Sequence, residues 1–325
     1  MCGISGTFAF PKLKKDLVME SIATLTHRGP DEFGFAKGKN FSLGMCRLAI
    51  IDIKDGHIVL LNEKKLEIYN FKELRTELES KGYKFRSKSD SEIIVPLYQE
   101  YGLTFPKKLQ GMFAIALYDE NIECAILVRD RLGKKPLWYS ISNQQLRFSS
   151  EIKGLLALGV ERNPNLKVFS EYLQFGYVNA PRSAFSGISQ LNPGTILQFS
   201  KSGVSVEKYW RFEDVHETNL RYEEAKSETH SLLKNAIQSR LISERPLGVF
   251  LSGGIDSSLI TAILSKIADQ PVHSFSIGFN EPDFDESNFA REVAKHLGTI
   301  HHEKIVEPNP LLILQTLGRV LDQPF

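Results

Sequence analysis

Leu247-Gly248-Val249-Phe250-Leu251-Ser252-Gly253-Gly254-Ile255-Asp256-Ser257-Ser258 is the stretch that decides the fold of the second half of this chain. The apolar run at 247–251 predicts a short buried strand of a parallel sheet. Two glycines then permit a tight turn, and apolar residues spaced along 259–267 predict a helix. Strand, glycine turn and helix in this order favour phosphate binding, because the first N–H groups of a helix are unpaired and positively polarised. The other interpretation is a plain glycine turn with Ser257 as the helix cap.

The pattern on either side of this loop separates the chain into two parts. Helices are expected over 222–241 and 286–297, and strands over 272–279 and 301–306, which predicts an α/β domain with a parallel sheet. The first 200 residues instead mix short strands with a few helices, as in a sheet-rich α+β domain. We therefore predict domains at 1–208 and 220–325, joined by a polar linker at 209–219.

Composition excludes several classes of protein. The chain has 325 residues, 42% apolar and 24% charged, as expected for globular domains. A formal net charge of +1 argues against nucleic-acid binding, and the apolar runs are too short for a membrane span. Cys2, Cys46 and Cys124 make neither a disulfide framework nor a metal-ligand spacing, and we expect Cys46 and Cys124 in the core. With no leader before Cys2, these features predict a reducing, cytoplasmic location.

Cys2 is the candidate nucleophile. Removal of Met1 would place its thiol and a free α-amine on one residue, which supplies an attacking group together with a general base. The α-amine titrates near pH ~8 and a cysteine thiol near ~8.5, so proton exchange between them is nearly balanced. Taken alone, a cysteine at position 2 is equally compatible with an incidental start of the chain.

Several separated motifs resemble one family. Ser252-Gly253-Gly254-Ile255-Asp256-Ser257-Ser258 resembles the pyrophosphate loop of enzymes that use ATP to adenylate a carboxylate, and with Cys2-Gly3-Ile4 it resembles glutamine-hydrolysing asparagine synthetases. Further matches follow in family order over nearly the whole chain: His27-Arg28-Gly29-Pro30-Asp31, Arg47-Leu48-Ala49-Ile50-Ile51-Asp52, Glu67-Ile68-Tyr69-Asn70, Ser89-Asp90-Ser91-Glu92, residues 129–137, Ser150-Glu151-Ile152-Lys153, Asn192-Pro193-Gly194 and residues 275–279.

The resemblance implies a fold and a set of site residues. The first domain would be an αββα sandwich of the N-terminal-nucleophile (Ntn) hydrolase type, a class II glutamine amidotransferase. The second would be a partial ATP-pyrophosphatase-type α/β domain, similar to adenine nucleotide alpha hydrolases. The substrates would be glutamine, aspartate and ATP with Mg²⁺, in a homodimer without nucleic acid or membrane. Cys2 would form a thioester with glutamine, and ammonia would pass to an aspartyl-AMP. The implied glutamine contacts are Arg47, Leu48, Ala49, Ile50, Ile51, Glu67 and Asp90. The implied ATP contacts are Leu251, Ser252, Gly253, Gly254, Asp256, Ser257 and Ile277, with Asp256 also on the metal.

Individual charged residues carry a plainer interpretation. Arg47 and Asp90 would otherwise be ordinary surface charges, and Asp90 could cap a helix. Arg28 and Asp31 fit either a loop-ordering ion pair or a substrate contact. Residues 129–131 are expected to be structural.

Two departures from the family pattern bear on activity. Lys65-Leu66 stands where the family has the Asn-Gly of its oxyanion hole, and a strand's worth of residues is expected to be absent there. The family's later Ser-Gly-Glu-Gly-x-Asp-Glu segment and catalytic lysine do not follow Phe325, so this chain is expected not to complete asparagine synthesis. The alternatives are a non-catalytic partner or regulatory protein of the same fold, and an ATP-dependent amidotransferase that acts on another carboxylate.

Overall fold

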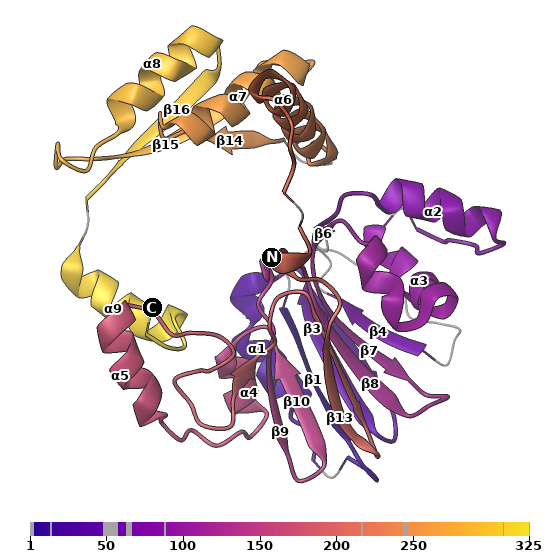
Figure 1. Cartoon of the computed structure of the whole chain (residues 1–325). Coiled ribbons are helices and arrows are strands. Elements are labelled where there is room, and N and C mark those ends of the chain that lie inside the picture. The colour runs from indigo at the N-terminus through magenta and orange to yellow at the C-terminus, as the bar shows by residue number, and fades with distance from the viewer. Residues whose placement is uncertain are drawn as a thin grey trace. The chain divides into compact units, whose positions relative to one another are not determined.

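The computed structural model describes residues 3–13, 15–47, 58–62, 67–87, 89–215, 217–242, 246–307 and 309–324, without the side chains of Glu32, Arg47, 58–62 and Arg319 (Figure 1). The chain forms two compact units. Met1–His216 and Gly318–Phe325 make up the first unit, and Glu217–Leu317 the second.

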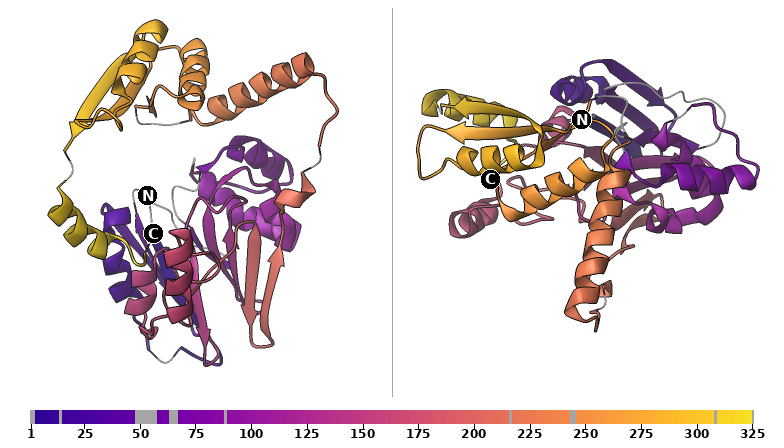
Figure 2. Two further views of the ribbon diagram at one scale, coloured as in Figure 1. Left: turned by 60° about the vertical axis from the view of Figure 1, so that its left-hand side comes forward. Right: turned by 90° about the horizontal axis from the view of Figure 1, so that it is seen from above.

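The first unit contains two antiparallel sheets that lie face to face (Figures 1 and 2). The six-stranded sheet has the order β11 (Ser189–Gln190), β9 (Trp138–Ser142), β10 (Gln145–Ser149), β1 (Gly3–Ala9), β3 (Phe41–Arg47) and β2 (Glu32–Lys37). The five-stranded sheet has the order β13 (Gly203–Lys208), β12 (Thr195–Ser200), β8 (Cys124–Arg129), β7 (Ala114–Asp119) and β4 (Ile58–Asn62). A small pair, β5 (Glu67–Ile68) with β6 (Gly111–Met112), lies outside both sheets.

The side chains of the strands alternate between the two faces of each sheet and contribute to three layers of buried apolar residues. In β7, Ala116 and Tyr118 face the other sheet, whereas Ile115 and Leu117 face the outer helices. Successive side chains of a strand point to opposite faces, so a strand covered on both sides must be apolar throughout. Cys124 and Cys46 are buried in the outer layers, and the prediction that they are core residues is confirmed.

Helices cover the outer face of each sheet. The six-stranded sheet is covered by α1 (Val18–Thr24) and α4 (Ile152–Ala157). The five-stranded sheet packs against the layer of α2 (Phe71–Ser80), α3 (Ile94–Tyr101) and the 3-10 helix η3 (Gly102–Lys108). The 3-10 helices η1 (Thr26–Arg28), η2 (Asp90–Ile93) and η4 (Phe212–Asp214) and helix α5 (Leu166–Phe175) complete the unit. The predicted αββα sandwich is confirmed.

The second unit is an α/β unit with a parallel sheet, as predicted. Its sheet has the order β14 (Gly248–Phe250), β15 (His273–Phe279) and β16 (Ile300–Val306). Its helices are α6 (Tyr222–Ser239), α7 (Ile255–Ile267) and α8 (Ser287–Leu297), of which α8 packs on β15 and β16. Helix α9 (Pro310–Val320) follows β16 in the chain, and its last residues belong to the first unit.

The expected burial of residues 247–251 is confirmed for Leu251 but is wrong for Leu247 and Phe250. Phe250 is 82% exposed, and Phe275 and Ile277 on the same face of the sheet are also exposed. Leu251 points to the opposite face, where it packs against Ala290 and Ala294 of α8. The strand therefore has one covered and one open face among the described residues.

Candidate functional site

The first residue of β1 follows Cys2 directly, and the start of this strand is held by backbone contacts. Cys2 itself lies outside the described residues. Ile4 N donates to Ser150 Oγ over 3.0 Å, and Ser150 N donates to Ile4 O over 2.9 Å. A Cβ on Gly3 would lie 3.0 Å from both Cys46 Sγ and Leu25 Cβ, so a side chain there would press on the packed layer behind it. The strand that carries the candidate nucleophile is therefore fixed at its first residues.

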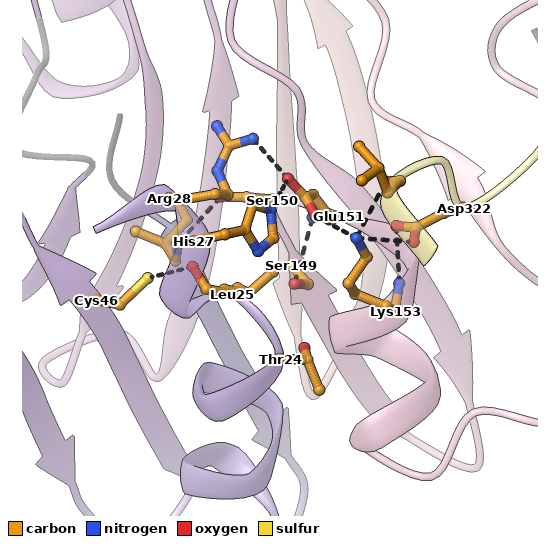
Figure 3. Close-up of polar contacts among 12 residues, drawn as sticks. Thr24, Leu25, His27, Arg28, Cys46, Ser149, Ser150, Glu151, Lys153 and Asp322 are labelled. Carbon is orange, nitrogen blue, oxygen red and sulfur yellow. Dashed lines mark hydrogen bonds and ion pairs between the residues drawn. The ribbon is translucent and has the colours of Figure 1, made fainter. Parts of the chain in front are cut away.

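Glu151, the residue after Ser150, contacts three basic side chains, those of His27, Arg28 and Lys153 (Figure 3). Its carboxylate lies 2.8 Å from Arg28 Nη1, 3.1 Å from His27 Nε2 and 3.0 Å from Lys153 Nζ. Burial acts to raise the pKa of Glu151, but the hydrogen bonds from Arg28, Lys153 and His27 outweigh it and hold this pKa below its usual range. Arg28 thus forms an ion pair with Glu151, a partner that the sequence did not indicate.

Glu67 and Asp90 are brought together by β5 and η2. Asp90 Oδ2 accepts the Ile68 backbone N–H over 3.2 Å, and Tyr69 Oη donates to Glu67 Oε2 over 3.4 Å. Burial raises the pKa of Asp90 to about 6, against the lowering effect of backbone hydrogen bonds, and the negative charge of Glu67 adds to the rise. Among the side chains that the structure describes, no lysine, arginine or histidine forms an ion pair with either carboxylate. We call these two carboxylates, which have no cationic partner among the described side chains, the anionic corner.

The remaining predicted glutamine contacts are described only in part. Arg47 ends β3, where its backbone pairs with Glu32, and nothing is described of its side chain. Leu48, Ala49, Ile50 and Ile51 lie outside the described residues, as do Lys65 and Leu66. Before Glu67 the structure has β4, which pairs with β7 from Ile58↔Asp119 to Asn62↔Ile115.

In the motif at 129–137, the side chains of Arg129 and Asp130 form hydrogen bonds with backbone groups. The buried Arg129 guanidinium donates to the carbonyl groups of Gly133, Lys135 and Leu191. Asp130 accepts backbone N–H groups from Phe113, Leu132, Lys134 and Lys135. These contacts agree with the structural role expected for this motif.

The predicted phosphate loop joins the carboxyl end of β14 to the amino end of α7. Gly254 is the residue that precedes α7, and no side chain caps the first turn. Ser257 does not cap the helix, since its hydroxyl group lies 3.0 Å from Ser252 Oγ and donates to Gly254 O. Gly253 has φ +84°, and a Cβ there would lie 2.5 Å from Phe289 Cβ. The loop is therefore a glycine-dependent turn that leaves open helix N–H groups, which fits an anion.

The predicted ATP contacts divide between two faces of the sheet. Ser252, Gly254 and Asp256 are exposed at the loop, and Gly253 and Ser257 are half-buried beside them. Leu251 is 1% exposed and its backbone N–H donates to Phe275 O, whereas Ile277 lies on the exposed face. Within the described parts of the chain no cluster of three or more His, Cys, Asp or Glu side chains could hold a metal ion. Asp256 lies in the first turn of α7 outside any such described cluster, so a magnesium ion there would also need phosphate oxygens as ligands.

Sequence reasoning missed one set of contacts in the first unit. Lys153 is bound by Asp322, which lies 169 positions away along the chain. No local pattern reveals a pair at that separation, although both segments carry family motifs.

Comparison with known proteins identifies the class of both units. Residues 1–210 match the family model described as a glutamine amidotransferase domain, and residues 228–325 match the model described as asparagine synthase. The chain belongs to the family of glutamine-hydrolysing asparagine synthetases. It is 31% identical over 320 residues to asparagine synthetase [glutamine-hydrolyzing] 1 of Bacillus subtilis (strain 168), which covers 95% of this chain and 50% of that protein. It is 34% identical over 330 residues to asparagine synthetase B of Escherichia coli (strain K12), which covers 93% and 54%.

The chain spans about half the length of these curated relatives. Among solved structures, glutamine phosphoribosylpyrophosphate amidotransferase from B. subtilis aligns with 97% of this chain and 70% of its own, at 15% identity and a TM-score of 0.49. Over the described residues, no helix combines the length and apolar character that crossing a membrane requires.

Proposed function

We propose that this chain takes part in glutamine-dependent asparagine synthesis. In this proposal the first unit hydrolyses glutamine at Cys2, and the ammonia reacts with an aspartyl-AMP that the second unit helps to form from aspartate and ATP. Family membership supports the reaction class. The observation that carries the proposal is the anionic corner of Glu67 and Asp90.

A substrate ammonium group matches this corner. A part-buried carboxylate with a raised pKa is stabilised when a cation approaches it, because the cation favours the charged form. The α-ammonium group of glutamine is such a cation, and it would donate charge-assisted hydrogen bonds to Asp90 and Glu67. In the proposal Arg47 would pair with the substrate carboxylate, so that both ends of the amino acid are fixed while its side-chain amide is presented to Cys2.

The reaction at Cys2 follows from its chemistry. The thiol would attack the side-chain amide carbon of glutamine, while the α-amine of the same residue takes the thiol proton and delivers it to the leaving ammonia. Water would then hydrolyse the resulting thioester to glutamate. Ile4 and Ser150 support this step by fixing the first residues of β1.

The second unit would bind ATP through the loop at residues 252–257. The open N–H groups at the start of α7 and the hydroxyl groups of Ser252 and Ser257 would hold the pyrophosphate portion, and Asp256 would bind its magnesium ion. Leu251 and Ile277 would border the adenosine, Ile277 by its exposed side chain. Domain limits of 1–208 and 220–325, a homodimer and a cytoplasmic location belong to the same proposal.

The replacement of Asn-Gly by Lys65-Leu66 favours a second candidate, a non-catalytic protein of the same fold. Loss of one oxyanion donor lowers the rate of related reactions by about 10²–10³. An amidotransferase acting on a carboxylate other than aspartate is the third candidate.

One labelling experiment separates the first two candidates. The protein is incubated with a glutamine analogue that carries a diazo-ketone, and the modified residue is located by peptide mass spectrometry. Stoichiometric modification of Cys2, with Cys46 and Cys124 unmodified because they are buried, is expected. A protein that stays unlabelled while Cys2 is intact and accessible to iodoacetamide would contradict the glutaminase proposal. Cys2→Ala is the control.

A further inference from the structure

The C-terminal segment of the first unit, residues 318–324, binds next to the strand start that carries Cys2. Asp322 Oδ2 accepts the Lys153 backbone N–H over 3.0 Å, and Gln323 Oε1 accepts the N–H of Ala184 over 3.1 Å. Lys153 N belongs to the first turn of α4, whose N-cap residue Glu151 makes no side-chain capping bond. Asp322 therefore supplies the capping carboxylate that Glu151, engaged by Arg28, does not give.

The ammonium group of Lys153 lies between two carboxylates (Figure 3). It is 3.0 Å from Glu151 Oε2, 3.3 Å from Asp322 Oδ1 and 3.1 Å from Val320 O. These three acceptors match the three N–H donors of a lysine. All three charged side chains are part-buried, with 21%, 17% and 15% of Lys153, Glu151 and Asp322 exposed. Solvent therefore screens the contacts less than at an open surface.

The contacts of Lys153 and Glu151 are linked to the start of β1 through Ser150. Glu151 is adjacent to Ser150, whose hydroxyl group accepts the Ile4 N–H two residues after Cys2. If Asp322 leaves, Lys153 loses one carboxylate and α4 loses its cap. We expect Lys153 then to pair more closely with Glu151, in competition with Arg28 and His27 for the same carboxylate.

We propose that Lys153 is a positioning residue for the glutaminase reaction, and that docking of Asp322 and Gln323 sets its position. Helix α9 runs directly into this segment, and the residues from Gly318 on belong to the first unit. This inference rests on the proposed glutaminase function.

The test variants are Asp322→Asn, Lys153→Met and the double variant that combines these two substitutions. Asp16→Asn is the control. Asp16 is a matched control, because its carboxylate also accepts a first-turn N–H, that of Val18, and pairs with a lysine, Lys37, over 3.0 Å. It makes no described contact with Glu151. We expect each test variant to lower kcat for glutamine about five-fold or more, with KM nearly unchanged, since the couplings between sites are typically of this size. The double variant should be no worse than the single ones.

Hydrogen exchange of the Ile4 and Lys153 amides supplies a readout that does not need catalysis. Asp322→Asn should speed exchange at both amides about five-fold or more, whereas Asp16→Asn should leave them unchanged. The inference would be overturned if Asp322→Asn sped exchange at the Lys153 amide but not at the Ile4 amide. It would also be overturned if Asp16→Asn lowered kcat as much as Asp322→Asn did, at an equal loss of thermal stability. If the parent protein does not hydrolyse glutamine, the proposed function fails, and exchange at Ile4 still decides whether the segment controls the strand start.

Discussion

Asp90→Asn is expected to stabilise the protein and weaken its hold on glutamine at once. Asparagine keeps the shape of the side chain and an oxygen that accepts the Ile68 N–H, which Asp90 binds over 3.2 Å. It removes the charge that burial and the nearby Glu67 make unfavourable. It also removes the charge proposed to bind the ammonium group of the substrate. The two effects therefore have opposite consequences for fold and function.

The magnitude follows from the raised pKa. The folded-state pKa of Asp90 is about 6, against 3.8 ordinarily. The folded protein therefore holds this proton more tightly than the unfolded chain, and stability falls as pH rises from about 4 to above 6. Two units correspond to roughly 3 kcal/mol, and partial screening by solvent reduces the expected gain of Asp90→Asn at pH 8 to about 1.5–3 kcal/mol. Toward pH 4 the gain should vanish.

The assay is urea unfolding of both proteins between pH 4 and pH 8, together with KM for glutamine. KM should rise about 10–100-fold, as for the loss of a charge-assisted hydrogen bond. Asp16→Asn is the control with the opposite sign: burial acts to raise the pKa of Asp16, but bonds from Ser42 and Lys37 lower it, so this variant should lose stability at pH 8. An Asp90→Asn protein that is less stable than its parent at pH 8, or that keeps its KM, would refute the reasoning.

Three further substitutions probe the loop, the Glu151 cluster and the motif at 129–137. Gly253→Ala should abolish most ATP binding, measured by calorimetry, and destabilise the second unit by about 1–3 kcal/mol, because alanine is strained at φ +84° and meets Phe289; ATP affinity within two-fold of the parent would contradict this. Glu151→Gln should lower the free energy of unfolding by about 2–3 kcal/mol at pH 7. Because the folded protein lowers the pKa of Glu151, this difference should shrink as pH falls through and below the range of an ordinary glutamate. A difference in unfolding free energy that does not depend on pH would count against the ion pairs. Arg129→Met should lower thermal stability by roughly 3 kcal/mol, because three buried carbonyl groups lose their donor; a change below 1 kcal/mol would show that solvent replaces the guanidinium.

Local patterns were sufficient for most elements of the fold. The hairpin of β9 and β10 was predictable from the polar turn between two apolar stretches, and Asn143 and Gln144 adopt the positive φ that such a turn needs. His301 and His302 lie on opposite faces of β16, as alternation along a strand requires: one bonds to Ser274, and the other stacks on His273. The exposure of Phe250 was not predictable, because an apolar run does not say how many faces of the sheet are covered.

The candidate site was predictable only where its residues lie in motifs. Glu67 and Asp90 were named from the sequence, but the raised pKa of Asp90 depends on the packing of η2 against β5. The ion pair of Glu151 with Arg28 required the folded chain, because the two residues lie 123 positions apart in the sequence. The sequence left Arg28 open between a loop-ordering ion pair and a substrate contact, and it did not name Glu151 as its partner.

The discontinuous makeup of the first unit has a consequence for its synthesis on the ribosome. Residues 217–317 must be translated before Gly318–Phe325 can join the unit that starts at the amino terminus. At an elongation rate of about 5–20 residues per second, that delay lasts roughly 5–20 seconds. During this interval the first turn of α4 and the ammonium group of Lys153 both lack the carboxylate of Asp322. The nascent amidotransferase domain would therefore first appear with a loosely held β1, and it would tighten only once the following hundred residues had left the ribosome.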